Sequence, residues 1–233
     1  MTNIHERLAH VRGLIEKAAG KSRRPGSDVL VVAVTKGVAP TGVLEARRAG
    51  LTVFAENKVQ EAAEKIPLMA PDSSWEWHFI GHLQSNKVKT ALSLFSLIQS
   101  VDSVRLAGEI AKEFQADPAD RLSAPRNILL QVNISGLAKR FGFEPEEVYG
   151  AVDAVNAMTG VRIAGLMGMA PHPASPEVKR EAFKKLKNIF SVCKGLVKDK
   201  SQMKFLSMGM SDDFELAIEE GSNMIRIGRL LFA

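Results

Sequence analysis

The 233-residue sequence is poor in several features, and each shortage excludes a class of structure. It holds a single cysteine, Cys193, so the chain cannot form an internal disulfide, and this composition fits a reducing compartment. No uncharged apolar run approaches the ~20 residues of a transmembrane helix. Residues 1–20 carry charges throughout, unlike a secretory signal peptide. We therefore expect a cytoplasmic protein that does not contact a membrane.

Aromatic residues are also scarce, at 6% of the chain, and the net charge is a modest +5. The basic residues are spread along the sequence, whereas nucleic-acid-binding surfaces gather them in a stripe, often interleaved with aromatics. We expect no nucleic-acid partner. With 45% apolar and 24% charged residues, the composition is that of an ordinary globular protein, and the length suits one large domain. We expect residues 1–233 to form a single domain, with no linker dividing them.

Strand-like and helix-like patterns alternate along the whole chain. Continuous β-branched and apolar runs, typical of strands buried on both faces, predict strands at 29–34, 51–57, 75–81, 95–101, 127–133, 161–169, 204–210 and 224–228. Helical spacing predicts a leading helix at 4–18 and connecting helices at 40–48, 85–92, 103–114, 145–158, 176–197 and 212–220. A further helix is predicted to follow the second strand and to end at about residue 66. This order predicts an α/β protein of one (β/α)8 TIM barrel with an extra N-terminal helix. A doubly wound open sheet is the alternative.

A lysine lies at the end of the first predicted strand, in the sequence Thr35-Lys36-Gly37. Barrel enzymes place their functional residues at the carboxyl ends of the strands. Because Lys36 follows a buried apolar run, we expect its amine to be partly desolvated and able to condense with an aldehyde. The alternative is a lysine that extends from the rim into solvent.

Polar residues also follow the second and third strands. Glu56 and Asn57 can cap the next helix or line a site. His78 and His82 are four residues apart, but on a strand this separation is about 13 Å, and no matching acid or cysteine pattern follows. We therefore expect no metal site, and we interpret His78 as a hydrogen-bonded interior residue.

The last two strands resemble an anion site. The segment 206–213 runs from a strand into a helix N-terminus, and the segment 225–229 supplies a glycine and two arginines. Glycine lets backbone approach a ligand, and phosphate sites on barrels frequently follow strands seven and eight. For Ser211 taken by itself, an ordinary helix cap is the better interpretation. A lysine facing a phosphate site fits a phosphorylated aldehyde cofactor, and it equally fits a Schiff-base aldolase acting on a sugar phosphate.

Several motifs resemble one family in the order expected of it. They are VVAVTK, FAENKVQEAAEKI, WHFIGHLQSNK, LLQVNISG, IAGLMGMAP and LSMGMSDDFELAIEEGSNMIRIG, and together they span nearly the whole chain. The sequence is similar to the YggS/PROSC family of pyridoxal 5′-phosphate (PLP) homeostasis proteins. That family shares its fold with the barrel domain of bacterial alanine racemase, and its members bind PLP without an established catalytic cycle.

The resemblance implies a role for each candidate residue. Lys36 would carry the cofactor as a Schiff base, Asn57 would lie beside it, and Arg226 would face the pyridine nitrogen. The phosphate would be surrounded by the side chains or backbone of Ser207, Met208, Gly209, Ser211, Gly228 and Arg229. The chain departs from the family where a small hydroxyl residue usually stands at position 229, and where GHLQ, with His82, replaces GPLQ.

The implied function is a monomeric, non-enzymatic PLP carrier that delivers the cofactor to apo-enzymes. A weak PLP-dependent amino-acid racemase is the main alternative. Efficient racemisation needs a second proton-transfer group, and the one tyrosine of the chain, Tyr149, lies in a predicted helix away from the strand ends. A sugar-phosphate aldolase and a barrel serving as an interaction scaffold are further alternatives.

Overall fold

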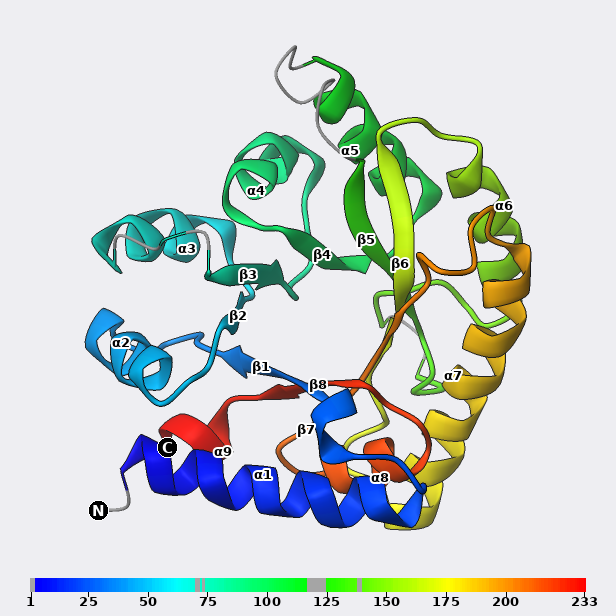
Figure 1. The fold of residues 1–233 in the computed structure, drawn as a ribbon. Helices are drawn as coiled ribbons and strands as arrows, with labels where there is room; N and C mark the ends of the chain where they lie inside the picture. Colours follow the sequence, from blue (N-terminus) through cyan, green and yellow to red (C-terminus); the bar gives the residue numbers. More distant parts are fainter. Residues whose placement is uncertain (1–2, 70–71, 73, 117–124, 138–139) are drawn as a thin grey trace.

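Eight parallel strands close into a barrel in a computed structural model that describes residues 3–69, 72, 74–116, 125–137 and 140–233. The strands follow one another in sequence order around the ring, and β8 pairs with β1 to close it (Figure 1). They are β1 Leu30–Val34, β2 Val53–Glu56, β3 Glu76–Phe79, β4 Leu97–Val101, β5 Arg126–Val132, β6 Val161–Gly168, β7 Phe205–Met210 and β8 Met224–Ile227. The predicted (β/α)8 barrel is confirmed.

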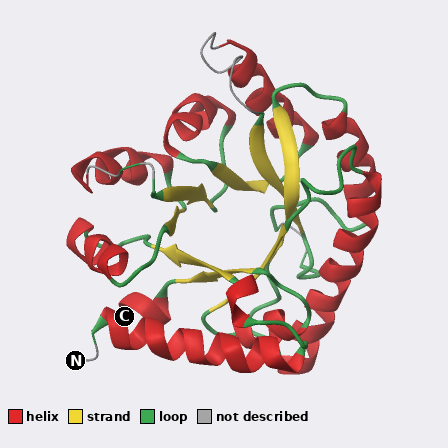
Figure 2. Cartoon of the chain, viewed as in Figure 1, coloured by secondary structure: helices red, strands yellow, loops and turns green. Residues whose placement is uncertain are grey.

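Helices surround this ring of strands (Figure 2). The connecting helices are α2 Pro40–Arg48, α3 Val59–Lys65, α4 Val88–Leu94, α5 Val104–Ala116, α6 Val148–Asn156, α7 Pro176–Leu196 and α8 Phe214–Glu219. Single 3-10 turns occur at η1 Gly26–Asp28, η2 Ile66–Met69 and η3 Ser85–Lys87. The expected extra helix is α1, Ile4–Lys21, which packs against α8 and against a short α9, Arg229–Phe232.

The leading helix α1 begins at a reciprocal cap. The Asn3 side chain accepts a hydrogen bond from the Glu6 backbone, and the Glu6 carboxylate accepts one from the Asn3 backbone. This arrangement satisfies two backbone donors that a helix start leaves free. Leu8, Val11 and Ile15 recur at helical spacing and are buried, which attaches α1 to the barrel.

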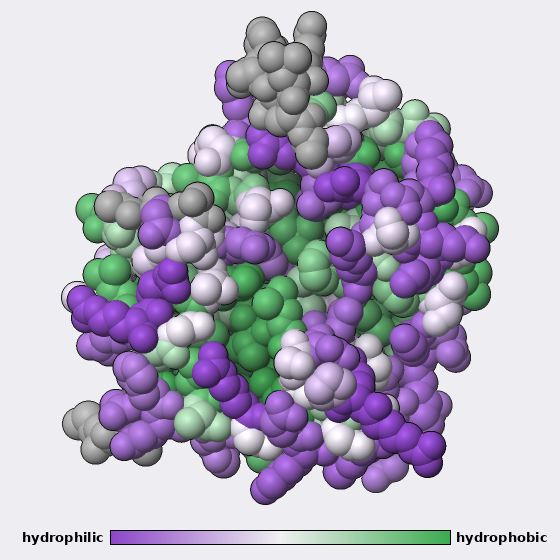
Figure 3. All heavy atoms as spheres, viewed as in Figure 1, coloured by the Kyte–Doolittle hydropathy of each residue, from purple (hydrophilic) through white to green (hydrophobic). Residues whose placement is uncertain are grey.

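The core has two parts, one between strands and helices and one inside the ring. Because side chains alternate along a strand, every second residue points into the ring. The inner cluster is mostly aliphatic and consists of Val32, Val53, Ala55, Leu97, Leu129, Ala164, Met167 and Met224. Figure 3 shows apolar side chains gathered at the centre of the visible face, with polar ones over the surrounding helices.

Some expected boundaries differ from the structure. The helix predicted at 212–220 begins only at Phe214, because the Asp213 carboxylate accepts a hydrogen bond from the Met210 backbone and closes a turn first. The predicted helix 145–158 is shorter at both ends, as α6. The four-residue helix α9 is not predicted, since it is too short to have a periodic pattern.

In the described segments, no helix combines the length and apolar character needed to cross a bilayer.

Cys193 is buried in α7, and burial raises the pKa of its thiol to about 11. A protonated thiol is a poor nucleophile, so Cys193 is a packing residue.

Candidate functional site

A cavity of about 350 Å³ opens where the strands end. Twelve residues line it: Val34, Lys36, Asn57, Ile80, Gly81, Met167, Met169, Met210, Ser211, Arg226, Gly228 and Arg229. Six of the nine residues predicted from the sequence are among them, namely Lys36, Asn57, Ser211, Arg226, Gly228 and Arg229. Contributions from β1, β2, β3, β6, β7 and β8 or the turns that follow them meet here.

Lys36 lies in a turn just beyond β1. The turn is closed by the Val38 N–H, which donates to the Thr35 carbonyl oxygen at 2.9 Å, and Gly37 takes the positive φ of 71° that its third position needs. Lys36 is exposed, contrary to the partial burial that we expect from the apolar strand, because β1 ends two residues earlier. Its ammonium has no hydrogen bond or ion pair with any residue that the structure describes.

A buried ion pair joins α3 to the end of β2, and both of its members bond to Thr35, the residue before Lys36. The Lys65 ammonium lies 2.7 Å from Glu56 Oε1, and their side chains are 12% and 0% exposed. The Thr35 hydroxyl donates to the same oxygen at 2.6 Å, while Lys65 also donates to the Thr35 carbonyl oxygen at 2.9 Å. Charge-assisted bonds therefore hold the peptide group that precedes Lys36.

Asn57 follows Glu56 directly and lines the cavity. Its Oδ1 atom is buried and has no hydrogen-bond partner among the described residues, which is costly unless a ligand supplies a donor. A Cβ atom on Gly81 would lie 2.0 Å from the Asn57 carbonyl oxygen. Only glycine allows this close approach of β2 and β3, so Gly81 sets the position of Asn57.

Arg226, on β8, brings a buried positive charge to the cavity. It is 4% exposed. Its Nη1 donates to the carbonyl oxygen and hydroxyl of Ser207 at 3.0 and 2.7 Å, and Nη2 donates to the Gly168 carbonyl oxygen at 3.0 Å. Burial lowers the pKa of Arg226 to about 10, partly offset by the nearby Asp213 carboxylate, so the guanidinium stays charged at neutral pH.

The residues predicted for an anion site divide into two groups. Ser211, Gly228 and Arg229 line the cavity, and the Ser211 hydroxyl makes no hydrogen bond within the described part of the chain. Arg229 pairs with Asp212. That ion pair joins the turn after β7 to the start of α9.

Ser207, Met208 and Gly209 lie outside this lining and are buried in β7. The Ser207 hydroxyl is engaged by Arg226 and by Gln99, and Met208 is 0% exposed within the core. Gly209 abuts α8, where a Cβ atom would lie 2.9 Å from the Phe214 backbone. The structure therefore does not bring these three residues to the cavity wall.

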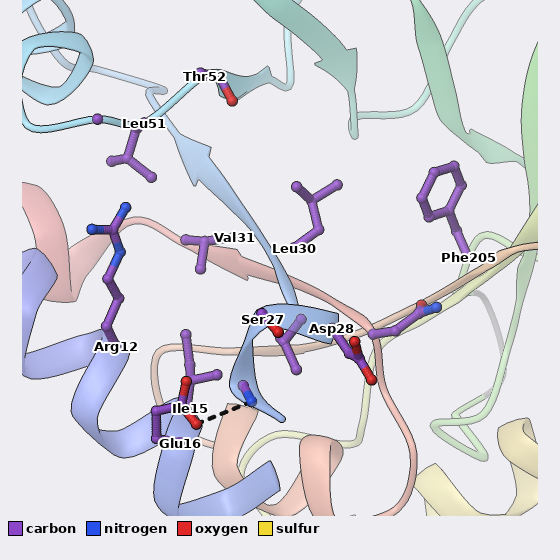
Figure 4. A pocket seen from close by; sticks show the side chains of 14 residues that line it. Arg12, Ile15, Glu16, Ser27, Asp28, Leu30, Val31, Leu51, Thr52 and Phe205 are labelled. Carbon is purple, nitrogen blue, oxygen red and sulfur yellow. Dashed lines mark hydrogen bonds between the residues drawn. The ribbon is translucent and has the colours of Figure 1, made fainter. Parts of the chain in front are cut away.

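A second cavity, of about 490 Å³, lies where the strands begin. Figure 4 shows side chains of α1, η1 and β1 around it, among them Arg12, Glu16 and Leu30. The Glu16 carboxylate accepts a hydrogen bond of 3.1 Å from the Gly26 backbone. No lysine lines this cavity, and none of the unpartnered buried side-chain atoms found in the described residues belongs to it. It offers neither the amine nor the free polar atom that the first cavity has.

The two histidines of the third strand region behave differently. His78 is 2% exposed and bonds to Gln99, which confirms the interior role predicted for it. His82 lies in the turn after β3, 3.0 Å from Asp102 through Nδ1, and its ring stacks on Phe141. Within the described ranges, no three His, Cys, Asp or Glu side chains group in a way that could hold a metal.

The sequence does not reveal which side chains form hydrogen bonds and ion pairs with the predicted residues and their neighbours. Lys65 looks like one of several helix lysines, and only its packing against Glu56 gives it a role. Gln99 lies in an apolar strand, and its polarity at an inward position is the signal that could have identified it.

The closed parallel barrel and a family-model match place the chain in the class of alanine-racemase-like barrels. Residues 9–233 match the family model described as the alanine racemase N-terminal domain. The chain belongs to the YggS/PROSC family of pyridoxal phosphate homeostasis proteins within that class. This result confirms the resemblance noted in the sequence.

Three relatives illustrate the relationship. The pyridoxal phosphate homeostasis protein of Aquifex aeolicus (strain VF5) is 36% identical over 236 residues, covering 99% of this chain and 97% of the relative. PipY of Synechococcus elongatus PCC7942, solved with PLP bound, is 31% identical with a TM-score of 0.83, covering 99% of this chain and 100% of that one. Alanine racemase of Clostridium difficile 630 shares the fold at 14% identity and a TM-score of 0.71, over 98% of this chain and 55% of its own.

Proposed function

We propose that this protein binds PLP as a Schiff base on Lys36 and acts in PLP homeostasis, holding the aldehyde and releasing it to apo-enzymes. One observation carries the proposal: three groups line the same cavity, namely the Lys36 amine and the Asn57 oxygen, neither of which has a partner among the described residues, and the buried Arg226 cation. The name of the Aquifex relative and the PLP-bound structure of PipY support it.

The residues present fit such a cofactor. Lys36 is exposed, lines the cavity and has no partner in the described part of the chain that it must give up before it reacts with an aldehyde. Asn57 Oδ1 is an acceptor that receives no hydrogen bond from the residues the structure describes, so a ring hydroxyl can satisfy it. Arg226 is a donor only, and it therefore suits an unprotonated ring nitrogen.

The phosphate would lie near Ser211, Gly228 and Arg229 in this proposal. The Ser211 hydroxyl makes no hydrogen bond to a described residue, and Arg229 adds a positive charge where the family usually has a hydroxyl. A guanidinium can bind phosphate by charge-assisted hydrogen bonds. The Ser207 side chain and the residues Met208 and Gly209 are not included, because their atoms are buried away from the cavity lining.

We infer a carrier rather than an efficient enzyme. Bound PLP supplies an electron sink, and an arginine at the ring nitrogen weakens it because the nitrogen stays unprotonated. Tyr149 lies on α6 and packs against the core, so it does not reach the cavity as a second proton-transfer group. We further propose that the chain works as one domain and as a monomer in the cytoplasm.

The test is an absorbance titration of the purified protein with PLP, followed by borohydride reduction and peptide mapping. We expect a visible Schiff-base band and a reduced adduct on Lys36. The Lys36→Ala variant should lose both. Lys58→Ala is the matched control, since Lys58 is an exposed lysine nearby that pairs only with Glu61 in the described structure, and it should retain them. A wild-type protein that stays colourless with PLP would refute the proposal.

A further inference from the structure

A chain of hydrogen bonds crosses the interior of the barrel from Arg226 to His78. Arg226 Nη1 is 2.7 Å from the Ser207 hydroxyl, which is 2.7 Å from Gln99 Oε1. Gln99 Nε2 is 3.0 Å from His78 Nδ1. His78 Nε2 lies 3.6 Å from the carboxylate of Glu76, whose side chain is 60% exposed at the start of β3.

These hydrogen bonds connect opposite sides of the ring of strands. Ser207 and Arg226 belong to β7 and β8, whereas Gln99 and His78 belong to β4 and β3. Arg226, Ser207, Gln99 and His78 are all at most 4% exposed. Barrel interiors are normally filled by branched apolar side chains, so a polar chain through this one needs an explanation.

Arg226 determines which group donates and which accepts in each hydrogen bond of this network. A guanidinium can only donate, so the Ser207 oxygen accepts from Arg226 and its hydrogen goes to Gln99 Oε1. This orients the Gln99 amide with its NH₂ group toward His78, whose Nδ1 must then accept. His78 is therefore assigned as the neutral tautomer with its proton on Nε2, facing Glu76. Burial, which lowers the pKa of His78, favours the same neutral form.

The hydrogen bonds of this network leave no buried donor or acceptor of its four side chains without a partner in the described residues. A paired network rigidifies a core, whereas one missing member leaves the others with a desolvation penalty. The position of Arg226 is thus coupled to side chains on the far side of the barrel.

We propose that Ser207, Gln99 and His78 are positioning residues that fix the Arg226 guanidinium toward the cofactor cavity. This inference rests on the proposed function, because the fixed guanidinium is the group assigned to the ring nitrogen of PLP. It assigns Ser207 to the arginine rather than to the phosphate. It also accounts for the polar residues on the inward faces of β3 and β4, which never reach the cavity wall.

The first test compares PLP binding by Ser207→Ala, Gln99→Met and wild-type protein. We expect each variant to bind PLP roughly tenfold more weakly, as for loss of a hydrogen bond to a charged group, and to shift the pH profile of the Schiff-base band. The matched control is Ser222→Ala. Ser222 is equally buried, but its hydroxyl is engaged by the carbonyl oxygens of Leu206, Met208 and Met224. This variant should lose stability and keep the wild-type affinity and profile.

The second test needs no cofactor. Nitrogen NMR of histidine-labelled protein without PLP reports the tautomer of each of the five histidines, and His78→Gln identifies the His78 signal. We expect His78 to be the Nε2–H tautomer in wild-type protein and in Ser222→Ala. In Ser207→Ala we expect a mixture of His78 tautomers, because the Gln99 amide can then exchange the positions of its oxygen and nitrogen atoms.

The outcomes separate the two proposals. An Nδ1–H tautomer in the wild type, or a Ser207→Ala variant that keeps both the wild-type tautomer and the wild-type PLP profile, overturns the positioning chain. A wild-type protein with the expected tautomer that does not bind PLP overturns the proposed function instead. If Ser207→Ala fails to fold, Gln99→Met and the wild-type tautomer still decide.

Discussion

The Lys65 ammonium donates a hydrogen bond of 2.9 Å to the carbonyl oxygen of Thr35, the residue before Lys36. The same ammonium is paired with Glu56, the residue before Asn57. One buried ion pair thus supports both residues assigned to the aldehyde side of the cofactor.

Replacing Lys65 by methionine should destabilise the protein and weaken PLP binding. The change leaves the buried Glu56 carboxylate without its cation, which costs about 3 kcal/mol of unfolding free energy. Urea unfolding of the PLP-free protein measures this cost, and an absorbance titration measures the affinity. Lys21→Met is the control, since Lys21 is 68% exposed and its pair with Glu219 is remote from the cavity. Equal unfolding free energies for the two variants would contradict the prediction.

Changes at the Arg229–Asp212 pair should move PLP affinity in opposite directions. Arg229→Thr removes a positive charge from the cavity wall and leaves Asp212 unpaired, so we expect weaker binding with less dependence on salt. Asp212→Asn frees Arg229 for the phosphate, so we expect tighter binding. Titrations at two ionic strengths measure both. If neither variant changes the affinity, Arg229 does not contact the phosphate.

Gly81→Ala should displace Asn57. The new Cβ atom would lie 2.0 Å from the Asn57 carbonyl oxygen, so the ends of β2 and β3 must separate. We expect lower stability and PLP binding weakened by roughly tenfold or more. Gly13→Ala on α1 is the control, because its Cβ atom meets nothing within 4 Å and alanine favours a helix. Wild-type affinity in Gly81→Ala would argue against a role for Asn57.

The buried His78 should make folding stability depend on pH. Burial lowers its folded-state pKa below the ordinary 6.5, so the unfolded chain takes up the proton first as the pH falls. The free energy of unfolding should therefore decrease as the pH falls below about 6.5 and level off once the folded-state pKa is passed. In His78→Gln this part of the decrease should be absent. Urea unfolding across this pH range compares the two proteins, and parallel curves would refute the prediction.

The sequence by itself determined the order of the elements and six of the twelve residues of the cavity wall. Lys36, Asn57, Ser211 and Gly228 are predictable because continuous apolar runs show where the buried strands end, and barrels place functional residues at those carboxyl ends. The family motifs add the identity of the cofactor proposed for them. These signals are local, so they can be interpreted without knowing which strands face each other.

Only the tertiary structure decided what holds those residues. Ser207 and Gln99 are 108 residues apart, and their bond exists because β7 and β4 lie on opposite sides of a ring whose register brings the two inward positions together. The Lys65–Glu56 pair depends in the same way on how α3 packs against the end of β2. The exposure of Lys36 was also beyond the sequence, since it depends on where β1 ends and the turn to α2 begins. Hydrogen bonds and desolvation are set by distances of a few ångströms between strands, which the order of residues along one strand does not specify.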